Sequence, residues 1–292
     1  MITGSIVALV TPMREDGSVD MDSLKRLVDW HVESGTDAIV SVGTTGESAT
    51  LDFDEHIEVI RKTLEFAAGR VPVIAGTGAN STSEARELTA AAAELGVSAC
   101  LLVTPYYNKP PQEGLYRHYT AIADAVDVPI ILYNVPGRTG CDMVPETVAR
   151  LAEHPRIVGV KEAYGTVERI RALIDLNLQD FAIYSGDDLT ACESILAGCH
   201  GDISVTANVA PATMHKMCAA ALAGDRAHAE DLDAEVEGLH KALFVQPNPI
   251  PVKWALQQMG HVPNGIRLPL VNLEEPHHDA VRTALRAAGA IE

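Results

Sequence analysis

The sequence predicts an α/β protein: a closed (β/α)8 TIM barrel with a C-terminal helical extension. Short apolar runs alternate with helical patterns along most of the 292 residues. The runs are continuous in Val, Ile and Leu, which is typical of parallel strands buried on both faces. Eight such runs occur, about 20 to 35 residues apart, as a barrel of eight βα units requires. A doubly wound parallel sheet is the alternative, because it shows the same alternation.

The expected strands are apolar runs that end in polar or glycine-rich turns. They cover residues 5–12, 37–43, 71–78, 98–105, 128–136, 156–162, 181–188 and 201–208. The first run has no basic flank before it, so we interpret it as a strand and not as a signal peptide. No apolar run approaches the roughly 18 residues of a membrane helix. We therefore expect no membrane partner.

The segments between these runs carry helical signals. Apolar side chains in residues 21–35 recur at i, i+3, i+4 and i+8. Asp20 is placed to cap the start of this helix and Gly35 to cap its end. Before a later helix, Ser81 and Glu84 have the spacing of a capping box. Each of these helices would cross from one strand to the next.

After residue 210 the pattern changes, because only helical segments follow and no further strand is evident. The first of these segments completes the barrel. We therefore expect a catalytic barrel over residues 1–224 and a C-terminal helical domain over residues 225–292.

Composition narrows the class of partner. The chain carries 40 acidic and 22 basic residues, a net charge of −18, which argues against binding to nucleic acid or anionic membranes. Its five cysteines include no CxxC pair, so neither a disulfide pattern nor a zinc site is expected. Cys100 lies in an apolar run and should be buried. Reduced cysteines fit a cytoplasmic protein.

Reactive or hydrogen-bonding side chains follow nearly every expected strand. In a barrel these strand ends form one rim, where active sites are assembled. Any single threonine there is equally well explained by the start of a loop. The residues are Thr11, Thr44, Thr45, Thr77, Thr104, Tyr133, Asn134, Lys161, Ser185, Asp187 and Thr206.

Two glycine-rich turns, residues 42–48 and 75–81, follow strands and precede helices. Backbone N–H groups in such turns can bind an anion. Neither turn matches the GxGxxG or P-loop spacing, so carboxylate binding is more plausible than nucleotide binding. Arg138 follows the fifth run and could hold a carboxylate with two hydrogen bonds, although an exposed loop arginine explains it equally well.

Lys161 is the most informative single residue. Among seven lysines it alone directly continues a β-branched strand run. Alternate residues of a strand share a face, which groups Ile157, Gly159 and Lys161. Ile131 and Tyr133 form the equivalent set on the preceding strand. We therefore expect Tyr133 and Lys161 to meet in the mouth of the barrel.

This pair suggests covalent chemistry. Burial penalises the ammonium form of a lysine, and the neutral amine can attack a ketone to give a Schiff base. The protonated imine makes the neighbouring carbon acidic, and a tyrosine within reach can transfer protons. The alternative is a lysine whose ammonium extends past the strand end to solvent.

Several motifs together resemble the dihydrodipicolinate synthase family of pyruvate-dependent class I aldolases. The match is collinear and covers nearly the whole chain. It consists of GSIVALVTPM, VSVGTTGESATL, PVIAGTGANST, LLVTPYYNKPPQEGLYRHY, ILYNVPGRTGCD, GVKEA, YSGDD, ISVTANVAP and NPIPVKWAL. The resemblance implies a cytoplasmic homotetramer, a dimer of dimers. It implies condensation of pyruvate with L-aspartate 4-semialdehyde, the first committed step of diaminopimelate and lysine biosynthesis, without metal or organic cofactor.

The resemblance also implies roles for single residues. Lys161 would form the Schiff base with pyruvate, and Tyr133 would transfer protons. Thr44 and Tyr107 would complete the proton relay, with Tyr107 supplied by a neighbouring subunit. Thr45 would help to hold the pyruvate carboxylate.

Further residues match the substrate-binding positions of the family. Arg138 would recruit the carboxylate of the semialdehyde. Gly186 and Ile203 would contribute backbone contacts to the pocket. Tyr164 departs from the family pattern, which commonly has threonine after KEA, and it could alter packing or kinetics.

Many family members bind L-lysine as a feedback inhibitor at a dimer interface, and we expect this chain to be inhibited too. Phe53 departs from the pattern, since some lysine-sensitive members have histidine there. The residues that match the inhibitor site are Ser48, Ala49, His56, Asn80, Glu84 and Tyr106.

Two alternatives remain open on the sequence. N-acetylneuraminate lyase and 2-keto-3-deoxy sugar-acid aldolases share the lysine, the tyrosine and a similar GTTGE turn, but Arg138 with Tyr106 and Tyr107 favours the synthase. A non-catalytic barrel that senses a small carboxylate is the other alternative. The intact set of Lys161, Tyr133, Thr44 and Tyr107 argues against it.

Overall fold

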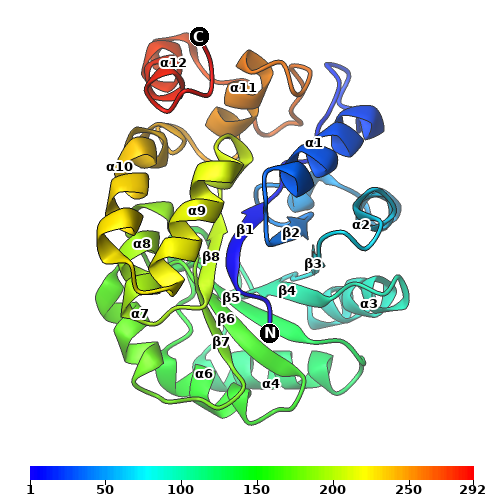
Figure 1. The fold of residues 1–292 in the computed structure, drawn as a ribbon. Helices are drawn as coiled ribbons and strands as arrows, with labels where there is room; N and C mark the ends of the chain where they lie inside the picture. The colour runs from blue at the N-terminus through cyan, green and yellow to red at the C-terminus, as the bar shows by residue number, and fades with distance from the viewer.

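A computed structural model describes all residues 1–292, and its eight strands close into one barrel (Figure 1). Every neighbouring pair is parallel, and β1 pairs with both β2 and β8. This confirms the predicted (β/α)8 barrel and excludes the doubly wound sheet. The strands are β1 (Gly4–Ala8), β2 (Ala38–Ser41), β3 (Val73–Gly76), β4 (Ala99–Val103), β5 (Ile130–Asn134), β6 (Ile157–Glu162), β7 (Ala182–Ser185) and β8 (Gly201–Ser204).

Helices surround the barrel and extend beyond it at the C-terminus. The α-helices are α1 (Met21–Glu33), α2 (Phe53–Ala67), α3 (Thr82–Glu94), α4 (Gln112–Ala123), α5 (Pro136–Thr139), α6 (Pro145–Ala152), α7 (Val167–Ile174), α8 (Asp188–Ala197), α9 (Pro211–Leu222), α10 (Arg226–Ala242), α11 (Ile250–Gln258) and α12 (His278–Ala287). Three short 3-10 turns are η1 (Ser48–Thr50), η2 (Thr206–Asn208) and η3 (Glu275–His277). None of the helices combines the length and apolar character needed to cross a membrane.

The predicted helix caps have mixed outcomes. The Asp20 carboxylate accepts a hydrogen bond from the backbone N–H of Ser23, and Gly35 adopts a φ of +85° just after α1. Ser81 does precede α3, but its side chain makes no capping bond and pairs instead with Ser83. The predicted capping box is therefore wrong, because a neighbouring hydroxyl competes for the serine.

Two apolar layers follow from strand alternation. Side chains such as Ile131 and Tyr133 point into the barrel and form a cluster of 13 buried residues. Their neighbours Ile130 and Leu132 belong to a cluster of 68 buried residues between the strands and the helices. All five cysteines are buried and unpaired, including Cys100 as predicted.

β6 contains an irregularity that the sequence argument missed. Ile130 pairs with Ile157, but Ile131 pairs with Gly159, so Val158 is an extra residue in the ladder. Such a β-bulge shifts the alternation by one position. Ile157 consequently lies in the outer cluster, and the prediction that it shares a face with Lys161 is wrong. The bulge ends before Gly159, so Lys161 still points inward.

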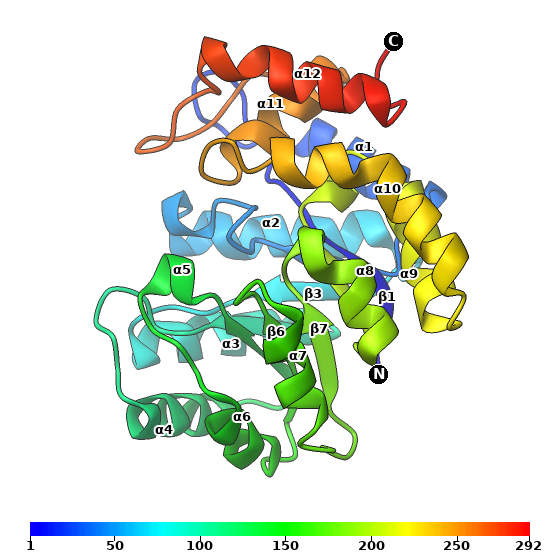
Figure 2. The ribbon, with the colours of Figure 1, turned by 90° about the vertical axis from the view of Figure 1, so that its left-hand side faces the viewer.

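The C-terminal helices share the core of the barrel. α10 packs against α8 and α9, and its Leu232 belongs to the same apolar cluster as the outer barrel residues. α11 and α12 lie together at the top of Figures 1 and 2. Residues 243–249, between α10 and α11, return to the rim of the barrel. A domain boundary at residue 224 stays a prediction.

Candidate active site

A cavity of about 200 Å³ opens at the carboxyl ends of the strands. Its lining residues come from β1, β2, β4, β5 and β6, from the segments that follow β2, β5, β6, β7 and β8, and from residues 243–249. Because parallel strands end at one rim, residues far apart in the chain meet there. The predicted site residues that line it are Thr44, Thr45, Tyr133, Arg138, Lys161 and Gly186.

Lys161 and Tyr133 are paired across β5 and β6, as predicted. The Lys161 Nζ lies 4.5 Å from the centroid of the Tyr133 ring. Lys161 is 5% exposed, and it forms no ion pair. The lysine is therefore a buried amine that lies against the face of an aromatic ring.

Gly186 leaves the space that the lysine occupies. A Cβ at this position would lie 2.7 Å from Lys161 Cε and 2.9 Å from its Cγ. Both separations are below normal carbon–carbon contact. Any larger residue at position 186 would clash with the lysine side chain and displace it from the path by which it reaches the cavity.

A second tyrosine also neighbours Lys161. Tyr184 of β7 is paired with Lys161 and points into the barrel. Its hydroxyl donates to the Ile2 carbonyl at 2.8 Å, and burial raises the pKa of Tyr184 to about 12. Tyr184 does not line the cavity, whereas Tyr133 does. Of the two phenols, Tyr133 is placed to meet a ligand.

The predicted carboxylate-binding residues are held by a residue that the sequence analysis did not select. The Asn248 side-chain N–H donates to Thr45 Oγ1 at 2.9 Å, and Arg138 Nη2 donates to the Asn248 carbonyl at 3.1 Å. Asn248 lies in the NPIPVKWAL motif, which was the only signal that could have identified it. Thr44 lines the same cavity, but no hydrogen bond joins it to Tyr133.

The outer face of β6 carries a buried carboxyl group directly after Lys161. Glu162 accepts hydrogen bonds from the Asn134 amide at 3.0 and 3.1 Å and from the Tyr164 backbone N–H at 2.9 Å. Arg169 Nη1 lies 3.7 Å from its Oε2. Burial raises the pKa of Glu162 to about 7, and the Asn134 and Arg169 contacts oppose that rise. The carboxyl serves the outer network and is not the partner of Lys161.

Tyr164, which departs from the family pattern, belongs to this outer network. The Arg169 guanidinium carbon lies 4.3 Å from the centroid of the Tyr164 ring. Arg169 in turn donates to both oxygens of Asp142, at 3.0 and 2.7 Å. The ring therefore covers one face of an arginine that links β6 to the segment after α5.

Two predicted site residues do not line the cavity. Tyr107 is 89% exposed and has a φ of +75°, an uncommon backbone conformation for a residue other than glycine. Ile203 is fully buried in the apolar layer inside the barrel. Within one chain, then, neither residue reaches the lysine site.

A second cavity of about 570 Å³ adjoins the first and shares Thr44, Val135, Arg138 and Asn248 with it. Asn80 stands outside its lining but donates to the Tyr106 carbonyl at 3.2 Å. The predicted inhibitor-site residues that line it are Ser48, Ala49, His56, Glu84 and Tyr106, and Phe53 lines it too.

His56 is one of the buried polar residues that line this second cavity. Its Nε2 lies 2.7 Å from the Gly76 carbonyl, and burial lowers the pKa of His56. A neutral imidazole that donates to a carbonyl satisfies both observations. The ring is therefore fixed to β3 rather than free to turn toward the cavity.

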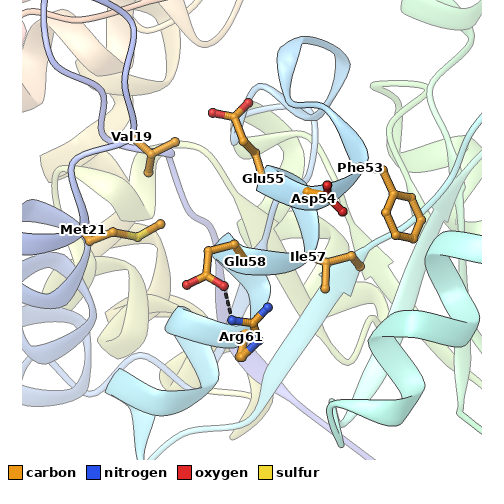
Figure 3. A pocket seen from close by; sticks show the side chains of 8 residues that line it. All are labelled: Val19, Met21, Phe53, Asp54, Glu55, Ile57, Glu58 and Arg61. Carbon is orange, nitrogen blue, oxygen red and sulfur yellow. Dashed lines mark hydrogen bonds and ion pairs between the residues drawn. The ribbon is translucent and has the colours of Figure 1, made fainter.

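An open hollow of about 600 Å³ lies on the other side of Phe53, between α2 and the start of α1 (Figure 3). Most of its charged groups already have partners, since Glu58 pairs with Arg61 and Glu55 with Arg267. No predicted site residue lines it. Nowhere in the chain do three or more His, Cys, Asp or Glu side chains lie close enough together to hold a metal ion.

The fold and the first cavity define a class of protein: a barrel with a buried amine at the strand rim, the place where barrel enzymes assemble their active sites. A family model described as the dihydrodipicolinate synthetase family matches residues 1–288, and the chain belongs to this family. It is a lyase. The family and the enzyme class predicted from the sequence are both confirmed.

Curated relatives and solved structures agree with this assignment. The chain is 64% identical over 291 residues to the 4-hydroxy-tetrahydrodipicolinate synthase of Methylococcus capsulatus, with 100% of each chain covered. It superimposes with a TM-score of 0.99, at 58% identity and 100% coverage of both chains, on the chloride-inhibited dihydrodipicolinate synthase of Acinetobacter baumannii complexed with pyruvate. The Cyanidioschyzon merolae enzyme with lysine bound gives a TM-score of 0.96 at 41% identity, with 99% of each chain covered.

Proposed function

We propose that the chain is a 4-hydroxy-tetrahydrodipicolinate synthase, which condenses pyruvate with L-aspartate 4-semialdehyde through a Schiff base on Lys161. The observation that carries this proposal is the position of Lys161: buried, without an ion-pair partner, and beside Tyr133 in a small cavity. The reaction would be the first committed step of diaminopimelate and lysine biosynthesis, in the cytoplasm. The pyruvate complex of the Acinetobacter relative supports the choice of substrate.

The proposed chemistry needs only groups of the chain. The neutral Lys161 amine adds to the ketone carbon of pyruvate, and loss of water gives the protonated imine. Tyr133 relays a proton from the pyruvate methyl group, and the electron pair of that C–H bond forms the enamine. The enamine carbon attacks the aldehyde carbon, and the proton that Tyr133 relays goes to the aldehyde oxygen, which becomes a hydroxyl group. The amine of the semialdehyde then displaces Lys161 from the imine carbon and closes the ring.

The carboxylates of the two substrates would be bound separately. Thr45 is placed for pyruvate, near Lys161, while Arg138 lies between the two cavities and is placed for the semialdehyde. Arg138 supplies local positive charge in a chain of net charge −18. Gly186 would accommodate the substrate as well as the lysine, and Ile203 would support the pocket from inside the barrel.

The proton relay would be completed in an assembly. Thr44 lies in the cavity, and the exposed Tyr107 would enter the cavity of a second copy of the chain. A homotetramer built as a dimer of dimers would supply that copy. Sedimentation of the wild-type protein and of Tyr107→Phe tests this, since the variant should lose activity while it keeps its mass.

L-lysine would act as an inhibitor in the second cavity. Glu84 offers a carboxylate for an ammonium group, Ser48 and Tyr106 offer hydrogen bonds around it, and Asn80 holds the Tyr106 carbonyl from outside the lining. The lysine-bound Cyanidioschyzon relative supports this assignment. Turnover should fall as L-lysine is added, and Phe53→His should strengthen the effect. Unchanged turnover in high millimolar L-lysine would contradict the assignment.

The decisive experiment traps the imine and identifies the product. Borohydride with pyruvate should add one pyruvyl unit to the wild type and none to Lys161→Ala, while the surface variant Lys25→Ala serves as a control. Supplying the semialdehyde should give the cyclic product. An unlabelled wild type would sink the proposal, and cleavage of sialic acid without condensation would favour a sister aldolase.

A further inference from the structure

Asn248 joins the two predicted carboxylate-binding residues from outside the barrel. It lies in residues 243–249, is 5% exposed, and lines both cavities. Prolines 247 and 249 flank it and restrict its backbone. A rigid segment therefore delivers this one polar side chain to the rim of the barrel.

The side chain of Asn248 controls the direction of one proton. Its amide N–H donates to Thr45 Oγ1 at 2.9 Å. A threonine hydroxyl has one proton and two lone pairs. Because the oxygen already accepts from Asn248, the Thr45 proton is free to be donated into the cavity. That is the polarity that a carboxylate ligand requires.

The backbone of Asn248 holds the second residue. Its carbonyl accepts one hydrogen bond from Arg138 Nη2 at 3.1 Å. A guanidinium has five donors in a planar fork, so the others remain available for a carboxylate. The same residue thus orients Thr45 through its side chain and Arg138 through its main chain.

A second observation separates this role from simple structural support. The Asn248 Oδ1 is buried and has no hydrogen-bond partner. A buried acceptor without a partner lowers stability, and such groups in native proteins call for a functional explanation. The fold alone gives no reason to keep an amide here.

Helix α11 strengthens the same connection. It begins two residues after Asn248 and carries Lys253, which forms a buried ion pair with Glu47. Glu47 lies two residues after Thr45 in the turn that follows β2. The C-terminal segment therefore grips that turn at two points, one on each side of Gly46.

We propose that Asn248 is a positioning residue for both substrates: its side-chain amide orients Thr45 toward the carboxylate of pyruvate, and its carbonyl holds Arg138 for the carboxylate of the semialdehyde. This inference rests on the proposed function. A change of the Asn248 side chain should therefore disturb the orientation of Thr45 but leave the contact between the backbone carbonyl and Arg138.

The test measures both Michaelis constants in Asn248→Ala. The KM for pyruvate should rise about tenfold, while kcat and the KM for the semialdehyde stay within about twofold, because the Arg138 contact is to the backbone. Asn248→Asp should raise the pyruvate KM further, since a carboxylate would accept the Thr45 proton and repel the ligand. Parallel rises of both KM values would overturn the inference.

A double variant and a binding measurement complete the design. Asn248→Ala added to Thr45→Val should cost nothing beyond Thr45→Val alone, because both act on one hydroxyl; additive losses would contradict the inference. The pyruvate concentration for half-maximal borohydride trapping should rise with KM, and Asn248→Ser is measured alongside in case Asn248→Ala folds poorly. If the wild type traps pyruvate but neither variant shifts this concentration, only the inference fails. If the wild type does not trap pyruvate, the proposed function fails.

Discussion

The surroundings of Lys161 and Lys253 differ, although both lysines are 5% exposed. Lys253 forms an ion pair with Glu47, whose side chain is fully buried, and burial lowers the pKa of Lys253 while Glu47 opposes that change. Lys161 has no such partner, and its amine faces an aromatic ring and a cavity.

The comparison shows that burial alone does not mark a reactive lysine. A buried ammonium is normally paired, because an unpaired charge is costly to remove from water. Lys253 follows that rule and ties α11 to the turn after β2. Lys161 has no ion-pair partner and lies at the edge of a cavity, which is where an unpaired amine has a chemical use.

Removing Lys161 should produce the largest effect, and this effect should be on catalytic activity and not on stability. Lys161→Ala should lower kcat/KM by at least about 10,000-fold, because no other amine lines the cavity. The unfolding midpoint should stay the same or rise, since no ion pair is lost. Steady-state kinetics and thermal unfolding measure the two quantities. Substantial remaining activity would erase the contrast with Lys253.

Removing Lys253 should instead lower the stability of the fold. Lys253→Met leaves the Glu47 carboxylate buried without its partner, and should lower the free energy of unfolding by about 3–5 kcal/mol. Adding Glu47→Gln to the same chain should recover part of that loss. Denaturant unfolding measures both, and an unchanged midpoint would show that the pair contributes nothing. The folded fraction should still trap pyruvate.

Glu162 sharpens the comparison, since it is the carboxyl closest in sequence to Lys161 but lies on the opposite face of β6. Its pKa rises from 4.5 to about 7 on folding, so the folded protein binds this proton more tightly than the unfolded chain. The contribution of Glu162 to stability should therefore fall as pH rises from about 4.5 to 7. Relative to Glu162→Gln, the wild type should lose about 3 kcal/mol at most. A pH-independent difference would contradict this.

The smallest expected effect concerns Tyr164. Tyr164→Thr restores the family pattern and removes the ring that covers Arg169. The free energy of unfolding should fall by about 0.5–1 kcal/mol, as for an exposed cation–π contact. Tyr164→Phe is the matched control and should match the wild type. A change in kcat with unchanged stability would instead place Tyr164 in the catalytic region.

The sequence was sufficient to predict the strands and the pairing of Tyr133 with Lys161. Continuous apolar runs directly indicate buried parallel strands. The alternation of inward and outward side chains along two neighbouring strands places Tyr133 beside Lys161. Both signals are local or involve adjacent strands. Residue roles implied by the resemblance, such as those of Gly186 and Arg138, acquire physical reasons only from the packing around Lys161 and Asn248.

Other features depend on contacts that no local pattern encodes. Asn248 bonds to a residue 203 positions earlier in the chain, so its place beside Thr45 comes from the tertiary fold alone. The Ser81 cap failed because a neighbouring hydroxyl offered a competing bond. Ile157 was placed on the wrong face because a bulge leaves no trace in the apolar run.

That bulge gives β6 one residue more than the ladder with β5 requires, and the extra residue, Val158, lies before Lys161. Deleting Val158 would turn the strand into a regular one in which Ile157 and Gly159 keep their partners, so the amine would still project inward. Deleting Val160, two positions later, would instead move Lys161 into the outward-facing place of Val160 and Glu162 into the inward-facing place of Lys161. A one-residue deletion before Gly159 would thus leave Lys161 facing the cavity, whereas a one-residue deletion after Gly159 would turn Lys161 away from it.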